Sequence, residues 1–97
     1  MASPLNIGVS AVAVAPINKK RNSIRFQNAG TTQIYLKRIP LEGAYSLVSA
    51  TDYEAVLFPA SSSQEGGEAF ETDSILSFMA ISPGTPGLLA IYETKKV

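Results

Sequence analysis

Four acidic side chains fall close together in one loop-rich stretch and are the first residues to consider for chemistry. They are Glu65, Glu68, Glu71 and Asp73. Carboxylate oxygens are ligands that calcium prefers in proteins. The spacing, however, matches no EF-hand loop, and Gly66 followed by Gly67 does not make one. We therefore interpret this stretch as a solvated acidic rim and predict no metal site.

Three further patterns have residue types suited to catalysis or binding. Asp52 and Glu54 are two positions apart, so on a strand they would share a face, as a glycosidase pair would. The basic run Lys19–Arg21 could contact phosphate, but three residues at a turn of a neutral chain are weak evidence for nucleic-acid binding. The loop Gly84–Gly87 lacks the lysine and the helix start of a phosphate-binding loop.

Residue types that the chain lacks narrow its function further. It has no histidine and no cysteine. This composition removes the usual general base, thiolate metal ligands, disulfides and every nucleophile paired with histidine. We therefore predict that the protein is not an enzyme, and that it has no catalytic residue, no cofactor, no metal ion and no nucleic-acid partner.

Charge is segregated along the chain although the net charge is zero. Lys19–Arg38 holds six of the eight basic residues and no acid, and Glu42–Asp73 holds seven of the eight acids and no base. Two interpretations remain open. Either strands and loops have drawn different surface residues, or the protein packs beside other copies or a shell subunit, positive surface against negative.

The segments that carry several of these residues have the alternation of β-strands. In Ser23–Gln27 and in Thr32–Lys37, apolar residues occupy every second position, which puts them on one face of a sheet. Between them, Asn28–Gly30 supplies residues that tolerate positive φ where a chain reverses. The sequence therefore predicts a tight hairpin whose outward row includes Arg25 and Lys37.

The rest of the chain also predicts strands and turns, and no helix. Further strand candidates are Val9–Ala15, Ala44–Val48, Tyr53–Phe58, Ala69–Thr72, Ser74–Ile81 and Leu88–Thr94. About seven short strands with frequent turns predict an all-β protein, a single-domain antiparallel β-sandwich or small barrel. We expect an extended N-terminal arm over residues 1–8 and the sandwich domain over residues 9–97. The core is assigned to Ile24, Phe26, Ile34, Leu36, Phe78 and Ile91.

Three strand candidates are apolar on both faces. They are Val9–Ala15 and the two strands of the predicted C-terminal hairpin, Ser74–Ile81 and Leu88–Thr94. A sandwich strand with one wet face would instead alternate. For the C-terminal pair, either both strands lie centrally under the N-terminal arm and the long loop, or part of one face is an intermolecular contact.

Length and composition are typical of a small soluble protein made in a cytoplasm. A chain of 97 residues suits one domain. No run approaches the roughly 18–20 apolar residues that span a bilayer, so we predict no membrane partner. The start of the chain lacks the basic region of a signal peptide. No linker follows the last strand candidate, and we expect a complete module.

Two phrases of this sequence resemble small β-sandwich modules of tailed-bacteriophage structural proteins. They are R-x-S-I-x-F-Q-N-x-G-T-T-x-I-Y-L, within Ala13–Leu36, and A-I-S-x-G-x-x-G-L-L-A-I-Y-E, within Phe78–Glu93. Such modules occur in head decoration (cement) proteins, head fibres and tail or baseplate components. Because no second domain accompanies this one, it is most similar to a decoration protein. The resemblance implies a virion protein, assembled in the host cytoplasm, that binds and reinforces the outer capsid surface.

The resemblance also implies partners and an interface. The partners would be the major capsid protein and other copies of this chain, with a trimer as one arrangement. We assign the interface to an arm that orders only on binding, to the basic and aromatic side of the hairpin, and to the acidic rim. The assigned residues are Met1, Ala2, Ser3, Pro4, Leu5, Asn6, Ile7, Arg25, Tyr35, Lys37, Arg38, Glu65, Glu68, Glu71 and Asp73.

Two other functions stay open. The first is a low-copy tail, neck, baseplate or head-fibre module, which would be present in few copies per particle. The second is a glycan- or receptor-binding β-sandwich, which would need exposed aromatic residues grouped in a groove. Its candidate residues are Tyr45, Tyr53 and Phe58.

Overall fold

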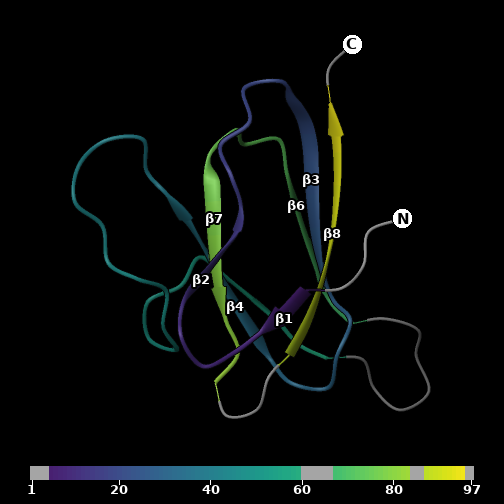
Figure 1. Ribbon diagram of the computed structural model, residues 1–97. Coiled ribbons are helices and arrows are strands. Elements are labelled where there is room, and N and C mark those ends of the chain that lie inside the picture. Colours follow the sequence, from purple (N-terminus) through teal and green to yellow (C-terminus); the bar gives the residue numbers. More distant parts are fainter. Residues whose placement is uncertain (1–4, 60–66, 84–86, 96–97) are drawn as a thin grey trace.

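The protein is a sandwich of two antiparallel four-stranded sheets (Figure 1). The computed structural model describes residues 5–59, 67–83 and 87–95, and these residues form eight strands. The strands are β1 (Leu5–Ile7), β2 (Val12–Ala15), β3 (Arg21–Asn28), β4 (Ile34–Ile39), β5 (Ala55–Leu57), β6 (Ala69–Thr72), β7 (Ser77–Ile81) and β8 (Gly87–Lys95). The first sheet has the order β1-β8-β3-β6 and the second β2-β7-β4-β5. The all-β, single-domain sandwich predicted from the sequence is confirmed.

The core lies between the two sheets and contains the residues that the alternation predicted. Ile24, Phe26, Ile34, Leu36 and Phe78 are buried, and Ile91 packs against them from a partly buried position. The Phe26 and Phe78 rings meet across the two layers with their centroids 5.0 Å apart. The period of two therefore identified the inward faces correctly.

The predicted hairpin between Ser23–Gln27 and Thr32–Lys37 is wrong, although both strands form. β3 pairs with β6 and β8 in the first sheet, whereas β4 pairs with β5 and β7 in the second. The chain thus crosses from one layer to the other after β3. Apolar alternation is the same for strands that face each other across a core and for strands that lie side by side, so it could not separate the two.

Asn28 shapes this crossing from a fully buried position. Its side-chain Nδ2 donates to the Thr32 carbonyl at 2.7 Å and to the Leu57 carbonyl at 2.9 Å. Its Oδ1 accepts a hydrogen bond from the Gly30 N–H at 2.9 Å. Gly30 does not have positive φ, but a Cβ there would lie 2.9 Å from the Leu88 nitrogen. Glycine is needed here for close approach and not for the predicted turn conformation.

β7 and β8 are both central strands, which confirms the position that one of the two interpretations gave them but not the cover that it expected. β7 lies between β2 and β4, and β8 lies between β1 and β3. Because they belong to different sheets, the predicted C-terminal hairpin is wrong. On the outward face of β7, Met79 and Ile81 are buried with Val48. This cover comes from the connection between β4 and β5, and not from residues 5–8, the described part of the predicted arm.

The N-terminal segment is partly a strand of the sandwich and not a separate arm. Leu5–Ile7 forms β1, which pairs with β8 at the edge of the first sheet. Ile7 is fully buried in the core. The prediction that residues through Ile7 order only on binding is therefore wrong for this strand, because Ile7 contributes to the folded core. Met1–Pro4 lies outside the described residues.

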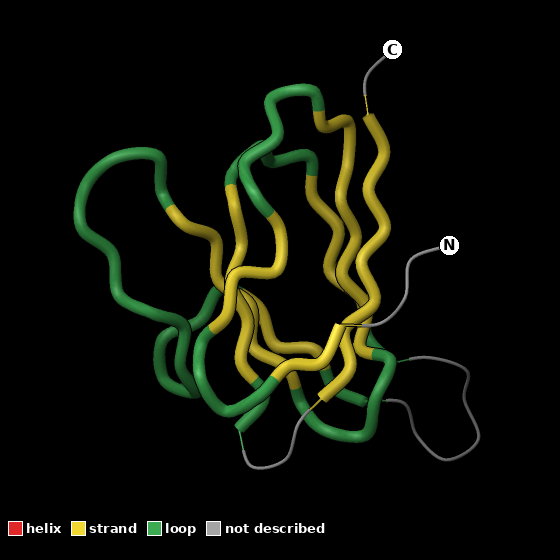
Figure 2. Tube along the Cα trace, viewed as in Figure 1, coloured by secondary structure: helices red, strands yellow, loops and turns green. Residues whose placement is uncertain are grey.

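The connection between β4 and β5 is a long excursion that stands off one side of the two layers (Figure 2). The strand predicted at Ala44–Val48 does not form. Val48 docks on the sheet instead, where its N–H lies 3.2 Å from the Met79 sulfur. Val48 is the only buried residue of Ala44–Val48, so the alternation of Tyr45 and Leu47 that predicted a strand does not reflect a buried face.

Candidate functional site

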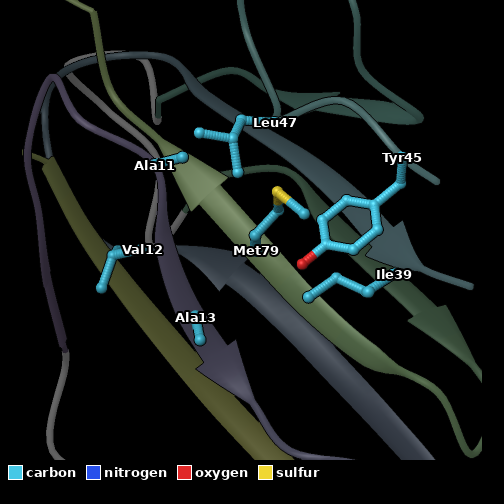
Figure 3. A pocket seen from close by; sticks show the side chains of 7 residues that line it. All are labelled: Ala11, Val12, Ala13, Ile39, Tyr45, Leu47 and Met79. Atoms are coloured by element: carbon cyan, nitrogen blue, oxygen red, sulfur yellow. The ribbon is translucent and has the colours of Figure 1, made fainter.

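An open apolar groove lies between this excursion and the outward face of the second sheet (Figure 3). Its volume is about 140 Å³. The lining residues are Ala11, Val12, Ala13, Ile39, Tyr45, Leu47 and Met79. Figure 3 shows Met79 at the centre, with Leu47 above it, the Tyr45 ring on one side and Ala11 and Ala13 on the other. Large apolar side chains exposed around a concavity are typical of interaction sites, so this groove is the candidate site.

The elements around the groove explain why it stays open. Ala13 of β2 and Ala11, just before this strand, contribute small side chains at one wall, and the excursion contributes Tyr45 and Leu47 at the other. Met79 is held between the walls because β7 is the central strand that pairs with β2. The alanine side chains are too short to reach across the groove. Tyr45 and Leu47 on the opposite wall therefore stay exposed.

Apart from Tyr45, which the glycan-binding alternative names, the sequence does not assign the groove residues to a binding surface. One usable signal was the uncharged segment Val9–Ala15, which is apolar on both faces. The second is the segment Ala44–Val48, for which the sequence predicts a strand. Neither signal reveals that the two segments meet over Met79, because that contact depends on the position of β7 between β2 and β4.

The predicted basic and aromatic surface is not assembled. Arg25 lies on β3 in the first sheet, directly opposite Glu71 on β6. Tyr35 and Lys37 lie on β4 in the second sheet, where their register partners in β7 are outward-facing residues. Since the two strands belong to different layers, the outward residues of β3 and β4 point to opposite sides of the sandwich. The structure therefore corrects the prediction that Arg25 shares one interface with Tyr35 and Lys37.

Lys37 is paired within the chain on the outward face of the second sheet. Its Nζ donates to Asp52 at 2.9 Å and to the Ser46 hydroxyl at 2.7 Å. The Ser46 hydroxyl also donates to the same Asp52 carboxylate. Hydrogen bonds from Ser46 and Lys37 hold the pKa of Asp52 below its ordinary value. These contacts fasten the middle and the end of the excursion to β4.

Arg38 is paired on the other side of the same strand, because consecutive strand residues point to opposite faces. Its guanidinium binds Glu54 through Nε and Nη2. It also lies 5.5 Å from the centroid of the Phe78 ring. The hydrogen bond to Glu54 raises the pKa of Arg38, and the charge of Asp73 adds to this effect. In turn, Arg38 lowers the pKa of Glu54.

These pairs bear on two possibilities that the sequence raises. Asp52 and Glu54 do not form a glycosidase-like pair on one face, since each carboxylate binds its own base on a different side of β4. The charges that are segregated in sequence are also brought together by folding, so they do not form opposite complementary surfaces at these positions. The support for charge-driven contact between copies is thereby lost for Lys37 and Arg38.

The acidic rim is likewise distributed among different contacts. A carboxylate oxygen of Glu68 accepts the Phe58 N–H at 3.2 Å, which joins the edges of the two sheets beside β5 and β6. Glu71 lies opposite Arg25, and Asp73 acts on Arg38. Glu65 lies outside the described residues. Within residues 5–59, 67–83 and 87–95, no three potential ligands gather as a metal site.

The ion pairs predict a loss of stability in acid. The pKa values of Asp52, Glu54 and Glu93 are all lowered in the fold. A carboxylate with a lowered pKa stabilises the fold above its unfolded pKa, near 4, and loses this contribution as the pH falls through its folded value. We therefore expect urea midpoints to fall between about pH 5 and pH 2.

The acid dependence can be assigned to one ion pair with a single variant. Glu54→Gln should show a lower midpoint than the parent at neutral pH and a smaller difference at low pH, because the parent has then lost the same charge. Urea titrations followed by far-ultraviolet circular dichroism measure both curves. Parallel curves for the two proteins would contradict a stabilising role for the Arg38–Glu54 pair.

Arg21 is a structural residue that the sequence did not distinguish from its basic neighbours. It is 1% exposed, and its guanidinium donates to the carbonyls of Pro16, Ser74 and Leu76 at 2.8–2.9 Å. Its Nε lies 2.6 Å from Glu93. Arg21 is therefore not available to contact phosphate, as the run Lys19–Arg21 had suggested. A side chain inside a basic run gives no sequence signal that it is buried.

The three aromatic residues considered for glycan binding are exposed, but they are divided among different contacts. Tyr45 lines the groove. Tyr53 packs edge-on against Tyr35, with ring centroids 4.9 Å apart. Phe58 follows β5, where its N–H binds Glu68. Among the described residues, only Tyr45 of the three lines the groove.

No helix in the described part of the chain is long and apolar enough to cross a membrane.

Comparisons with known proteins identify no relative of this chain. The chain was compared with protein-family models, with curated proteins and with solved structures, and no match was found.

Proposed function

We propose that this protein is a virion structural protein that binds the outer surface of an assembled phage capsid and reinforces it. The observation that carries the proposal is the open apolar groove on the second sheet. Its exposed lining residues, Tyr45 and Leu47, are of the types that a binding surface buries. The resemblance of two segments to phage β-sandwich modules supplies the class of partner, the major capsid protein.

The proposed mechanism is thermodynamic linkage. A protein that binds the assembled shell and not the free subunits stabilises the shell in proportion to its binding free energy. Each copy would contact neighbouring shell subunits. A shell subunit could then leave only after its contacts with the bound copies are broken. Modest affinity at each site is sufficient, because many copies act on one shell.

The structure changes which residues we propose for the contact. Lys37 and Arg38 are already engaged in ion pairs within the chain, with Asp52 and Glu54 respectively. Ile7 belongs to the core. We propose instead that the groove residues Tyr45 and Leu47 make the central contact. Arg25 and Glu71, on the outward face of the other sheet, remain candidates for a contact with a second partner or copy.

Two leucines of nearly equal exposure allow a matched test of this contact. Leu47 is 64% exposed and lines the groove, whereas Leu41 is 62% exposed and lies outside its lining. We expect Leu47→Ser to weaken binding to shells that lack this protein by about tenfold, or 1.4 kcal/mol. Leu41→Ser should bind as the parent does. Co-sedimentation with purified shells measures both.

The thermal midpoints of the two variants should stay close to that of the parent, because exposed positions contribute little to stability. Equal binding by Leu47→Ser and the parent would remove the groove from the interface. Equal weakening by both variants would indicate a broad hydrophobic effect and not a specific site.

A low-copy tail, neck, baseplate or head-fibre module remains the alternative function. The same groove would then contact a ring or fibre subunit, and the copy number per particle distinguishes the two roles. The glycan-binding alternative has less support, because the aromatic residues that it needs are divided among three different contacts.

A further inference from the structure

The strand that forms one wall of the groove is also the edge of its sheet. β2 pairs with β7 on one side, and on its other side no strand of the described residues pairs with it. Alternate residues of an edge strand direct their N–H and C=O groups away from the sheet. β2 therefore presents backbone donors and acceptors next to an apolar groove.

The first part of this edge lacks the protection that most exposed edges carry. Natural edge strands are usually blunted by charged side chains, by proline or by a bulge. No charged residue occurs in the stretch Val9–Ile17. The register shifts between Ala13 and Ala15, which disrupts the far half of β2. Pro16 follows this irregularity. The unprotected part is therefore the start of β2 and the residue before it, Ala11–Ala13.

The size of the groove indicates what it can accept. A cavity of about 150 Å³ holds one molecule as large as benzene. The groove, at about 140 Å³, therefore suits one large apolar side chain. A strand added beside β2 would lie about 5 Å from it. Because Ala11 and Ala13 form a low wall, a long side chain on such a strand can reach over them toward Met79.

The exposed apolar area argues against a second copy as the occupant. Three partly exposed large side chains, Val12, Tyr45 and Leu47, surround the groove. Each offers on the order of 100 Å², since whole aromatic side chains bury about 150–250 Å². Their sum is well below the roughly 800 Å² that each partner contributes to a stable interface. A segment that adds backbone hydrogen bonds needs less side-chain area.

We propose that Ala11–Ala13 accepts an extended segment of the partner as an added β-strand, with one large apolar side chain of that segment in the groove. The identity of the partner, a capsid subunit, rests on the proposed function. The mode of binding rests on the free edge and the groove alone. Backbone pairing supplies the register, and the groove selects leucine, methionine or phenylalanine at one position of the segment.

Synthetic strands test this mode without the partner. The probes are three short peptides of alternating valine and threonine with lysine at each end and leucine, methionine or phenylalanine at the centre. We expect at least one to bind with Kd below about 1 mM. Binding should slow amide hydrogen exchange within Ala11–Ala13 by about tenfold or more, since an added strand protects the amides that it pairs with.

Two matched changes separate strand addition from simple apolar contact. Probes that are N-methylated at alternate residues, in both possible phases, lose the donors of one edge, and one phase should bind about tenfold more weakly. Ala13→Leu places a larger side chain at an exposed position beside the groove, where it should block entry of the probe's central side chain. Binding of the unmethylated probe should weaken by a similar factor. The thermal midpoint of this variant should be unchanged.

Three results would overturn the inference. They are no binding by any of the three probes, binding that is insensitive to both phases of N-methylation, and protection of the edge by self-association of the protein alone. Failure of the capsid proposal gives a different result, because the probes would still bind β2 while the protein is absent from particles. Conversely, a protein that is abundant on particles but ignores the probes would retain the proposed function and lose this mode of binding.

Discussion

Replacing Phe78 with alanine should lower the free energy of unfolding by about 3–5 kcal/mol, the usual cost of removing a buried aromatic side chain. Phe78 is 1% exposed. Its ring centroid lies 5.0 Å from that of Phe26 and 6.5 Å from that of Phe70, so it joins both sheets. The Arg38 guanidinium also lies over this ring. The substitution therefore leaves a cavity where both layers and an ion pair meet.

Phe58 supplies the control for this prediction. It is 45% exposed, and Phe58→Ala should change stability by about 1 kcal/mol or less. Urea unfolding followed by circular dichroism measures both variants, since the chain has no tryptophan to serve as a fluorescent probe. Similar losses for the two phenylalanines would contradict the assignment of Phe78 to the centre of the core.

Arg21→Ala should destabilise the fold by about 3–4 kcal/mol. The variant leaves three carbonyls, of Pro16, Ser74 and Leu76, without the donors that they now share. It also removes the charged partner of Glu93. Burial alone would raise the pKa of Glu93, but hydrogen bonds from Arg21 and Asn18 outweigh it and lower that pKa. The side chain of Glu93 remains 28% exposed, so its share of the loss is the smaller one.

Arg21→Lys separates the charge of Arg21 from its geometry. Lysine keeps the cation but lacks the planar fork that reaches three carbonyls and a carboxylate together. We expect this variant to recover only part of the stability that Arg21→Ala loses, as measured by the urea midpoint at neutral pH. Full recovery would show that charge alone matters, and a neutral effect of Arg21→Ala would refute the structural role of the buried side chain.

The sequence predicted the elements of the fold better than their pairing. Alternation located the core positions Ile24, Phe26, Ile34 and Leu36, because a period of two depends only on which face of a strand is buried. It could not tell that β3 and β4 belong to different sheets. That choice depends on the buried side chain of Asn28 and on the approach of Gly30 to Leu88, both of which are tertiary contacts.

The site was less predictable than the fold for a related reason. Charge and residue type singled out Arg25, Lys37 and Arg38, but folding pairs Lys37 and Arg38 with acids that are distant in sequence. The groove is formed by small and apolar residues that have no distinctive chemistry individually. Its position depends on how the excursion of residues 40–54 returns over β7, which local sequence patterns do not encode.

The count of this chain in purified virus particles tests the central proposal most directly. Quantitative mass spectrometry would compare it with the major shell protein of the same particles. A decoration protein predicts about one copy for each shell subunit, or one for each trimer of them, as expected for an element repeated over a symmetric lattice. A handful of copies per particle would instead indicate a neck, tail or fibre component. Complete absence from particles would contradict the virion proposal.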